Sequence, residues 1–249
     1  MTYGKFAYLY DKLMSDVPYD KWVQLVLQAH QDFQPSGKKL LDLACGTGEL
    51  SIKFSEAGFQ VAGVDLSEDM LSVAQGKTDD AGQSIFYLEQ DMSALEGLPL
   101  FDIIGIFCDS LNYLETEEEI LATFAGVHRY LEDDGLFVFD IHSVYKMNTL
   151  FNNQTYALND DDLSLIWQCY EGEYADSVEH ELTFFELDPA TEKYNRYDEV
   201  HFQRTFSIDQ YKNWLSESGF TILKIAADFD KEEVKEKAER IFFFCKKSQ

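Results

Sequence analysis

Positive charge is scarce in this chain of 249 residues. It holds 20 Lys and Arg against 46 Asp and Glu, which gives a formal net charge of −26. Such a surface repels phosphate backbones unless the bases cluster, and the sequence shows only the short pairs Lys38-Lys39 and Lys246-Lys247. The composition therefore disfavours nucleic acid as a partner, although a local basic patch would still permit it.

Cysteines and long apolar runs are also scarce. No run approaches the roughly 18 apolar residues of a membrane span, and the N-terminus lacks the basic and then apolar order of a signal peptide. We therefore expect a cytoplasmic protein with no membrane partner. The cysteines lie far apart in apolar surroundings and show neither metal-ligand spacing nor a disulfide framework, so we expect reduced core thiols and no metal site: Cys45, Cys108, Cys169 and Cys245.

The segment 39–67 has the strongest pattern in the chain. An apolar run ends in the turn Cys45-Gly46-Thr47-Gly48, a helical stretch continues to Gly58, and the apolar run Val61–Val64 stops at Asp65. This order predicts a strand, a glycine turn, a helix and a second strand tipped by an acid. It is typical of the first βαβ unit of a Rossmann-like nucleotide site.

The details of this unit restrict its ligand. Gly46 and Gly48 let the backbone pass close to a ligand, and Asp65, about 20 residues further on, can accept both hydroxyls of a ribose. The position of a third glycine is Ser51, and Asp42 precedes the turn. A carboxylate there repels a pyrophosphate but suits an ammonium and a sulfonium, which argues against a nicotinamide oxidoreductase.

At these residues the chain resembles the class I S-adenosylmethionine-dependent methyltransferases. Their first motif, Asp-x-x-x-Gly-x-Gly, corresponds to Asp42-Leu43-Ala44-Cys45-Gly46-Thr47-Gly48. The resemblance covers residues 40–143 and implies S-adenosylmethionine as cofactor, bound along this motif. The alternative is a glycine turn that only connects a strand to a helix.

Further cofactor contacts follow from the resemblance. It implies that Asp91, after a third strand, accepts a hydrogen bond from the adenine amino group while the amide of Met92 meets the ring; Asp91 could instead cap a short helix. Leu66 and Met70 are placed to flank the adenine, although core packing explains Met70 equally well. The remaining candidates are Cys108, at the end of the fourth strand, and Tyr3 and Tyr10, in an aromatic N-terminal segment that covers the methionine end in related families or simply packs on the core.

The rest of the chain fits an α/β, doubly wound, Rossmann-like sheet of seven strands with the last strand antiparallel. Ser67 and the capping boxes Thr116/Glu119 and Ser207/Gln210 predict three helix starts. The last two strands are expected at 220–227 and 241–245. Residues 1–153 and 207–249 would form this domain.

Residues 154–206 are extra to such a fold. Three stretches alternate apolar and polar residues, at Leu163–Cys169, Val178–Phe184 and Val200–Phe206. They predict an inserted antiparallel sheet of about three strands. We expect it to form a lid over the acceptor pocket; a stabilising or dimerising flap is the alternative, so the sequence leaves a monomer and a homodimer open.

Methyl transfer from a sulfonium is an in-line displacement, so the protein mainly aligns the reactants and excludes water. His142 is the best-placed titratable group for a base, although a lone histidine is more often structural. Tyr113 is a weaker catalytic candidate, and Asp109, Tyr145 and Trp167 are acceptor-side candidates. The other four histidines show no ligand spacing.

These features favour an S-adenosylmethionine-dependent methyltransferase that acts on nitrogen or oxygen of a small-molecule acceptor. Two alternatives stay open: a non-catalytic cofactor-binding or partner-binding protein, and an RNA methyltransferase that uses a local basic patch. The loop at 108–111 reads Cys-Asp-Ser-Leu and lacks the Asn-Pro-Pro-Tyr type tetrapeptide of enzymes that methylate DNA bases or protein amides.

Overall fold

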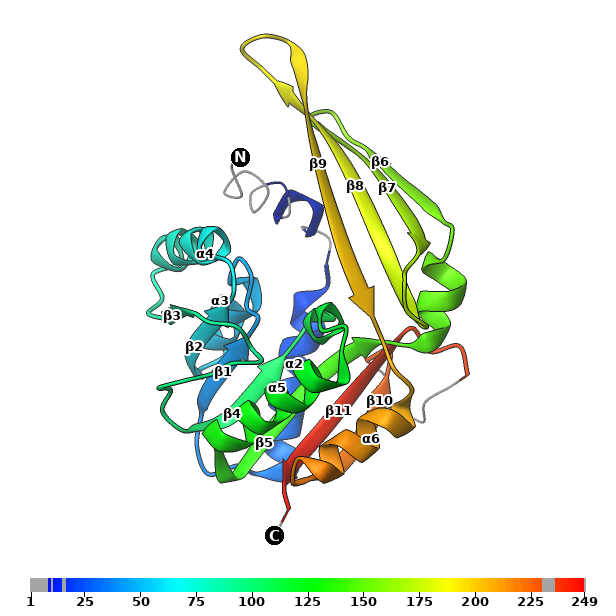
Figure 1. Ribbon diagram of the computed structural model, residues 1–249. Coiled ribbons are helices and arrows are strands. Elements are labelled where there is room, and N and C mark those ends of the chain that lie inside the picture. Colours follow the sequence, from blue (N-terminus) through cyan, green and yellow to red (C-terminus); the bar gives the residue numbers. More distant parts are fainter. Residues whose placement is uncertain (1–8, 10, 15–16, 230–235, 249) are drawn as a thin grey trace.

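The computed structural model describes residues 9, 11–14, 17–229 and 236–248. A seven-stranded sheet has the order β10-β11-β5-β4-β1-β2-β3, in which β11 runs antiparallel to both β10 and β5 (Figure 1). This confirms the predicted sheet with its antiparallel last strand. The strands are β1 (Lys39–Leu43), β2 (Gln60–Asp65), β3 (Phe86–Glu89), β4 (Phe101–Ile106), β5 (Leu131–His142), β10 (Phe220–Ala227) and β11 (Arg240–Lys247).

Helices cover both faces of this sheet. α2 (Tyr19–Phe33) and α3 (Glu49–Glu56) share one buried apolar cluster with it, while α5 (Glu117–Tyr130) and α6 (Ile208–Glu217) share the other. Every residue of β4 is buried, as expected for a central parallel strand covered on both sides. The carboxyl ends of β1, β2, β3 and β4 are therefore held at one edge by a core on each face.

The predicted helix starts are confirmed. Ser67 accepts a hydrogen bond from the amide of Met70 and caps α4 (Glu68–Asp80). Thr116 opens α5 and Ser207 opens α6, each with a complete capping box. The caps of α4 and α5 fix the positions at which the loops after β2 and β4 end.

The inserted sheet (residues 155–204) has four antiparallel strands in the order β6-β7-β8-β9. The prediction of three strands was wrong, because the first strand is exposed along its whole length and shows no apolar alternation. Figure 1 shows this sheet rising from the edge at which β5 ends. Its strands are β6 (Thr155–Asn159), β7 (Leu163–Glu171), β8 (Ser177–Asp188) and β9 (Lys193–Arg204).

The register of β9 leaves the apolar side chains of Val200 and Phe202 on the exposed face of the sheet. They pair with Glu181 and Glu179 and are 49% and 47% exposed. Alternate residues of a strand point to opposite faces, so the polar neighbours of these two side chains point inward. The inner face is apolar on β7 and β8, where it packs against Leu9.

This register predicts a large loss of stability for one Phe→Ala substitution and almost none for another. Phe184→Ala removes a fully buried ring of the inserted sheet and should lower the free energy of unfolding by about 3–5 kcal/mol. Phe202→Ala, on the outer face, should change it by no more than about 0.5 kcal/mol. Urea unfolding followed by circular dichroism measures both, and equal losses would contradict the register.

Candidate active site

A cavity of about 690 Å³ lies at the carboxyl ends of β1 to β4. Its wall also includes residues of the 3-10 helix η2 (Ser110–Tyr113) and His201 of β9. In open α/β sheets this edge is where ligands bind. The structure brings twelve of the candidate residues to this wall: Asp42, Ala44, Cys45, Gly46, Thr47, Asp65, Leu66, Met70, Asp91, Met92, Cys108 and Tyr113.

The two glycines of the turn serve different purposes. Gly46 has a φ of +54°, lines the cavity, and would place a Cβ within 4 Å of no other atom, so its bare backbone leaves room for a ligand. Gly48 has a φ of +76° and precedes α3. A Cβ at Gly48 would lie 2.6 Å from the Tyr87 hydroxyl and 2.9 Å from the Ala74 Cβ, so this glycine permits helix packing.

The carboxylate of Asp65 lies at the tip of β2. Its Oδ2 accepts the amide of Gly46 at 2.7 Å, and its Oδ1 accepts the amide of Ser67 at 2.9 Å. Burial raises its pKa, and these two amides oppose that shift by stabilising the anion. Each oxygen keeps a further lone pair, so the carboxylate can also accept from the two hydroxyls of a ribose.

Asp42 is almost completely buried in the floor of the cavity, with 2% of its surface exposed. Burial raises its pKa to about 7, although the Ser51 hydroxyl donates to Oδ2 at 2.5 Å. A carboxyl placed in this way is costly to ionise unless a cation binds beside it.

Beyond β2 and β3 the wall becomes more apolar. Leu66 is 67% exposed and lines the cavity together with Met70 and Met92. This part of the wall suits a flat apolar ligand. Asp91 caps the following turn, because its Oδ1 accepts both the amide and the hydroxyl of Ser93 at 2.7 and 2.8 Å. Both of these bonds use one oxygen, and Asp91 also lines the cavity, so capping and ligand binding are compatible.

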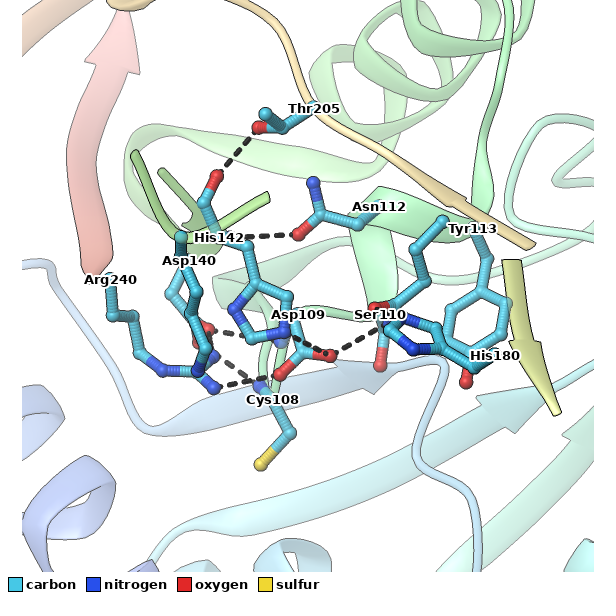
Figure 2. Close-up of polar contacts among 12 residues, drawn as sticks. Cys108, Asp109, Ser110, Asn112, Tyr113, Asp140, His142, His180, Thr205 and Arg240 are labelled. Carbon is cyan, nitrogen blue, oxygen red and sulfur yellow. Dashed lines mark hydrogen bonds and ion pairs between the residues drawn. The ribbon is translucent and has the colours of Figure 1, made fainter. Parts of the chain in front are cut away.

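A buried ionic cluster fixes the loop after β4 (Figure 2). Asp140 of β5 accepts the amides of Cys108 and Asp109, each at 3.0 Å, and the Trp22 indole at 2.8 Å. Its charge is balanced by Arg240 of β11. Cys108 and Asp109 both have left-handed backbone angles, φ +54° and +55°, which non-glycine residues adopt only at a cost.

The side chain of Asp109 completes the cluster. It accepts from Arg240 Nη2 at 2.7 Å, His142 Nε2 at 3.2 Å and Gln203 Nε2 at 2.9 Å. Burial alone would raise the pKa of this carboxyl, but the neighbouring Arg240 and His142 hold it well below its usual range. Because Gln203 belongs to β9, the cluster also ties the inserted sheet to the loop.

Known proteins resemble this chain in sequence and in structure. Residues 40–135 match a family model described as a methyltransferase domain. A protein of Geobacillus sp. (strain WCH70) is 49% identical over 248 residues, which are 99% of this chain and all of that protein. Its name describes a methyltransferase and mentions no acceptor. YqeM of Bacillus subtilis (strain 168), named in the same way, is 43% identical over 250 residues, all of this chain and 98% of YqeM.

The fold agrees with a solved structure over the same extent. A crystal structure of an S-adenosylmethionine-dependent methyltransferase from Clostridium acetobutylicum ATCC 824 superposes with a TM-score of 0.90 at 31% identity, covering 99% of both chains. This chain belongs to the class I S-adenosylmethionine-dependent methyltransferases. The predicted family, enzyme class and cofactor are thereby confirmed. The acceptor is not identified by these comparisons.

The wall of the methyltransferase cavity fits this cofactor. Asp65 offers a free lone pair on each oxygen to a ribose, and Asp42 offers a buried anion to a cationic group. The open space at Gly46 admits a chain along the turn, while Leu66 and Met70 suit an aromatic ring. Bound here, the cofactor supplies an activated methyl group on a sulfonium.

Several candidates do not reach the cavity wall. His142 is 4% exposed, and burial lowers its pKa to about 4, so it is neutral and donates to Asp109. This placement disfavours the predicted role of His142 as a base. Trp167 lies in the inserted sheet and donates to His180 at 3.0 Å, and Tyr145 precedes the π-helix η3 (Lys146–Phe151). Tyr3 and Tyr10 lie outside the described residues.

Three residues at the site were not predicted from the sequence: Arg240, Gln203 and His201. Arg240 is the cation of the buried cluster, and the only signal for it was an arginine directly before the apolar run of β11. Gln203 and His201 lie on the inner face of β9, opposite Val178 and His180 of β8. A strand with polar residues on one side and apolar ones on the other gives no sign that its polar side is the inner one.

Two further observations concern the described residues. No helix among them is long and apolar enough to cross a membrane. The four cysteines are free thiols; Cys45 and Cys108 lie in the cavity wall, and burial raises the pKa of both above the usual range. In the same part of the chain no group of three or more metal-ligating side chains comes together.

Removing Arg240 should be costly. Arg240→Met leaves the fully buried Asp140 and the partly buried Asp109 without a counter-charge, so we expect the free energy of unfolding at pH 7 to fall by about 3–5 kcal/mol. Arg196→Met, which breaks an exposed pair with Asp198, is the matched control and should change it little. Equal losses in urea unfolding would contradict this role of the cluster.

Asp42 should make cofactor binding depend on pH. Its pKa of about 7 means that the carboxyl is mostly protonated at pH 6 and ionised at pH 8, and a cationic ligand prefers the anion. We expect S-adenosylmethionine to bind up to about tenfold more weakly at pH 6 than at pH 8. Calorimetry measures this difference, and Asp42→Asn should weaken binding and abolish the pH dependence.

The same pKa shift affects stability in the opposite sense. Because the folded pKa of Asp42 lies above its unfolded value of about 3.8, the stability that it contributes at low pH is lost as pH rises toward 7. Asp42→Asn should therefore stabilise the cofactor-free protein at pH 8. The exposed Asp133→Asn is the control. A cofactor affinity of Asp42→Asn equal to that of the unchanged protein would contradict the assignment.

Proposed function

We propose that this methyltransferase transfers a methyl group to a nitrogen or oxygen atom of a small molecule held between the strand ends and the inserted sheet. The observation that carries the proposal is the continuity of the cavity, whose wall extends from Asp65 at the tip of β2 to His201 on the inner face of β9. A ligand bound by Asp65 therefore shares one space with the inserted sheet.

The inserted sheet is held firmly enough to act as a wall. Asn112 Nδ2 of η2 donates to the carbonyl of Arg204 at 2.8 Å, and Thr205 Oγ1 donates to the carbonyl of His142 at 2.6 Å. Arg204 Nη1 donates to the carbonyl of Glu115 at 2.6 Å. These bonds, with the one from Gln203 to Asp109, fix β9 beside the loop after β4, which supports the role of residues 154–206 as a lid.

The chemistry asked of the chain is mainly positional. Asp65 and the turn at Gly46 hold the cofactor, and the fixed loop after β4 lines the path between cofactor and acceptor with Cys108 and Ser110. The inserted sheet excludes water from that path. Alignment of this kind accounts for a large part of the rate of an in-line displacement, so no dedicated nucleophile is needed.

Two relatives support a nitrogen acceptor. The dTDP-3-amino-3,4,6-trideoxy-alpha-D-glucopyranose N,N-dimethyltransferase of Streptomyces venezuelae is 35% identical over 104 residues, 42% of each chain. The glycine/sarcosine N-methyltransferase of Aphanothece halophytica is 33% identical over 105 residues, 41% of this chain and 40% of that enzyme. Both names describe methylation of nitrogen, in the first case on a dTDP-linked amino sugar and in the second on glycine and sarcosine. RNA is disfavoured, because the described cavity wall carries no Lys or Arg.

Release of S-adenosylhomocysteine tests the proposal. The purified protein is given S-adenosylmethionine with the ultrafiltered metabolites, the total RNA or the total protein of Bacillus subtilis, which carries a close relative. We expect release with the metabolites alone. Asp65→Ala should bind the cofactor about 10 to 100 times more weakly and lose this activity.

Each other result has a definite meaning. Release with RNA or protein alone would overturn the proposal in favour of a macromolecular acceptor. Tight cofactor binding without release from any fraction would instead favour a non-catalytic binding protein.

A further inference from the structure

The cavity wall is strongly acidic. Seven carboxylates line it: Asp42, Glu49, Asp65, Glu68, Asp69, Asp91 and Glu119. Among the described residues of the wall there is no Lys or Arg, and Lys77 just outside it offsets one charge by pairing with Glu49 at 2.9 Å. His201 is the only basic side chain among the wall residues that the structure describes.

This charge distribution restricts what can enter. A cleft of one sign with apolar walls concentrates its field, draws in ligands of opposite charge and repels ligands of the same charge. A phosphate in the cavity would lie among carboxylates with no Lys or Arg of the wall to receive it. A protonated amine would be attracted, as the cationic cofactor is.

An amine that arrives protonated must lose a proton before it can attack, and one group in the cavity is placed to take it. His201 points inward from β9, and its Nδ1 lies 3.4 Å from the Tyr113 hydroxyl, with the two rings edge to face at 79°. Burial lowers the pKa of His201 below its usual value, so the ring is neutral at pH 7 and can accept a proton.

Three described titratable groups lie close to His201, and none of them is placed to take that proton. Tyr113 faces it from η2, His180 is its cross-strand partner on β8, and Glu199 shares its face of β9. Tyr113 is 46% exposed, and its phenol, like any phenol with the ordinary pKa of about 10, is a neutral hydroxyl at pH 7 that can orient the imidazole. His180 is 4% exposed and does not line the cavity, and neither does Glu199.

We propose that the acceptor is a small cationic amine without phosphate and that His201 is the catalytic residue that removes its proton. The proposal rests on the proposed function and names its substrate class. One ammonium proton passes to the imidazole of His201, which becomes imidazolium. The freed lone pair forms the N–C bond as the C–S bond breaks, and that electron pair stays on sulfur in the departing S-adenosylhomocysteine. The imidazolium then returns its proton to solvent.

Ion exchange of the metabolite extract tests the substrate class. The extract is separated at pH 7 into a fraction retained by a cation exchanger, a fraction retained by an anion exchanger and the unretained remainder. We expect S-adenosylhomocysteine release with the first fraction alone, and a lower KM at low salt than at high salt.

Release confined to the anionic or the unretained fraction would overturn this inference and leave the small-molecule function standing. Release with RNA or protein alone, or with no fraction at all, would count against both.

A pH profile tests His201 with the most active fraction. His201→Gln keeps a polar side chain but removes the titrating ring, so we expect kcat at pH 7 to fall by about 10²–10⁴ while the affinity for S-adenosylhomocysteine changes less than about twofold. Its kcat should then rise about tenfold per pH unit toward pH 9, as the free amine becomes available. The unchanged enzyme should lose activity only below neutral pH.

Val200→Gln introduces the same side chain on the outer face of the same strand and should behave as the unchanged enzyme. A His201→Gln variant with an unaltered pH profile, or with a loss that is constant at every pH, would overturn the role of His201 in proton removal.

Discussion

The attraction between Arg240 and two buried carboxylates holds the active-site edge of this methyltransferase together. Arg240 lies on the antiparallel strand β11, Asp140 on β5 and Asp109 in the loop after β4, so three segments far apart in sequence meet at one guanidinium (Figure 2). The loop itself is strained at two consecutive residues. The hydrogen bonds from its two amides to Asp140 offset the cost of that strained backbone.

The same cluster explains how an inserted sheet becomes part of the cavity wall. Gln203 of β9 donates to Asp109, and two backbone carbonyls near it accept from Asn112 and Thr205. These contacts depend on one register: a shift by a single residue would turn Phe202 and Val200 inward and carry His201 to solvent. The apolar packing of β7 and β8 against Leu9 helps to select the observed register.

Negative charge is the other constraint. A net charge of −26 is spread over the chain, and seven acidic side chains lie in the cavity wall, where a cationic cofactor would offset their mutual repulsion. Asp42 is the clearest case, since its burial makes ionisation costly until a cation is near. Stability of the free protein is thereby reduced in exchange for affinity, as is common at binding sites.

The sequence by itself determined the fold class, the family and the residues along the glycine turn. These features depend on local order: an apolar run, two glycines and an acid at the end of the next strand lie within 30 residues or so, and the capping boxes need only four. Twelve candidate residues, predicted from this local order or from the family resemblance, lie in one cavity wall.

Only the tertiary structure decided which residues meet around the loop after β4. Arg240 meets Asp109 across 131 positions, and Gln203 meets it across 94, distances over which no local pattern carries information. It also decided that His142 is enclosed while His201 reaches the cavity, because the face of a strand that is buried depends on what packs against it and not on the strand's own alternation.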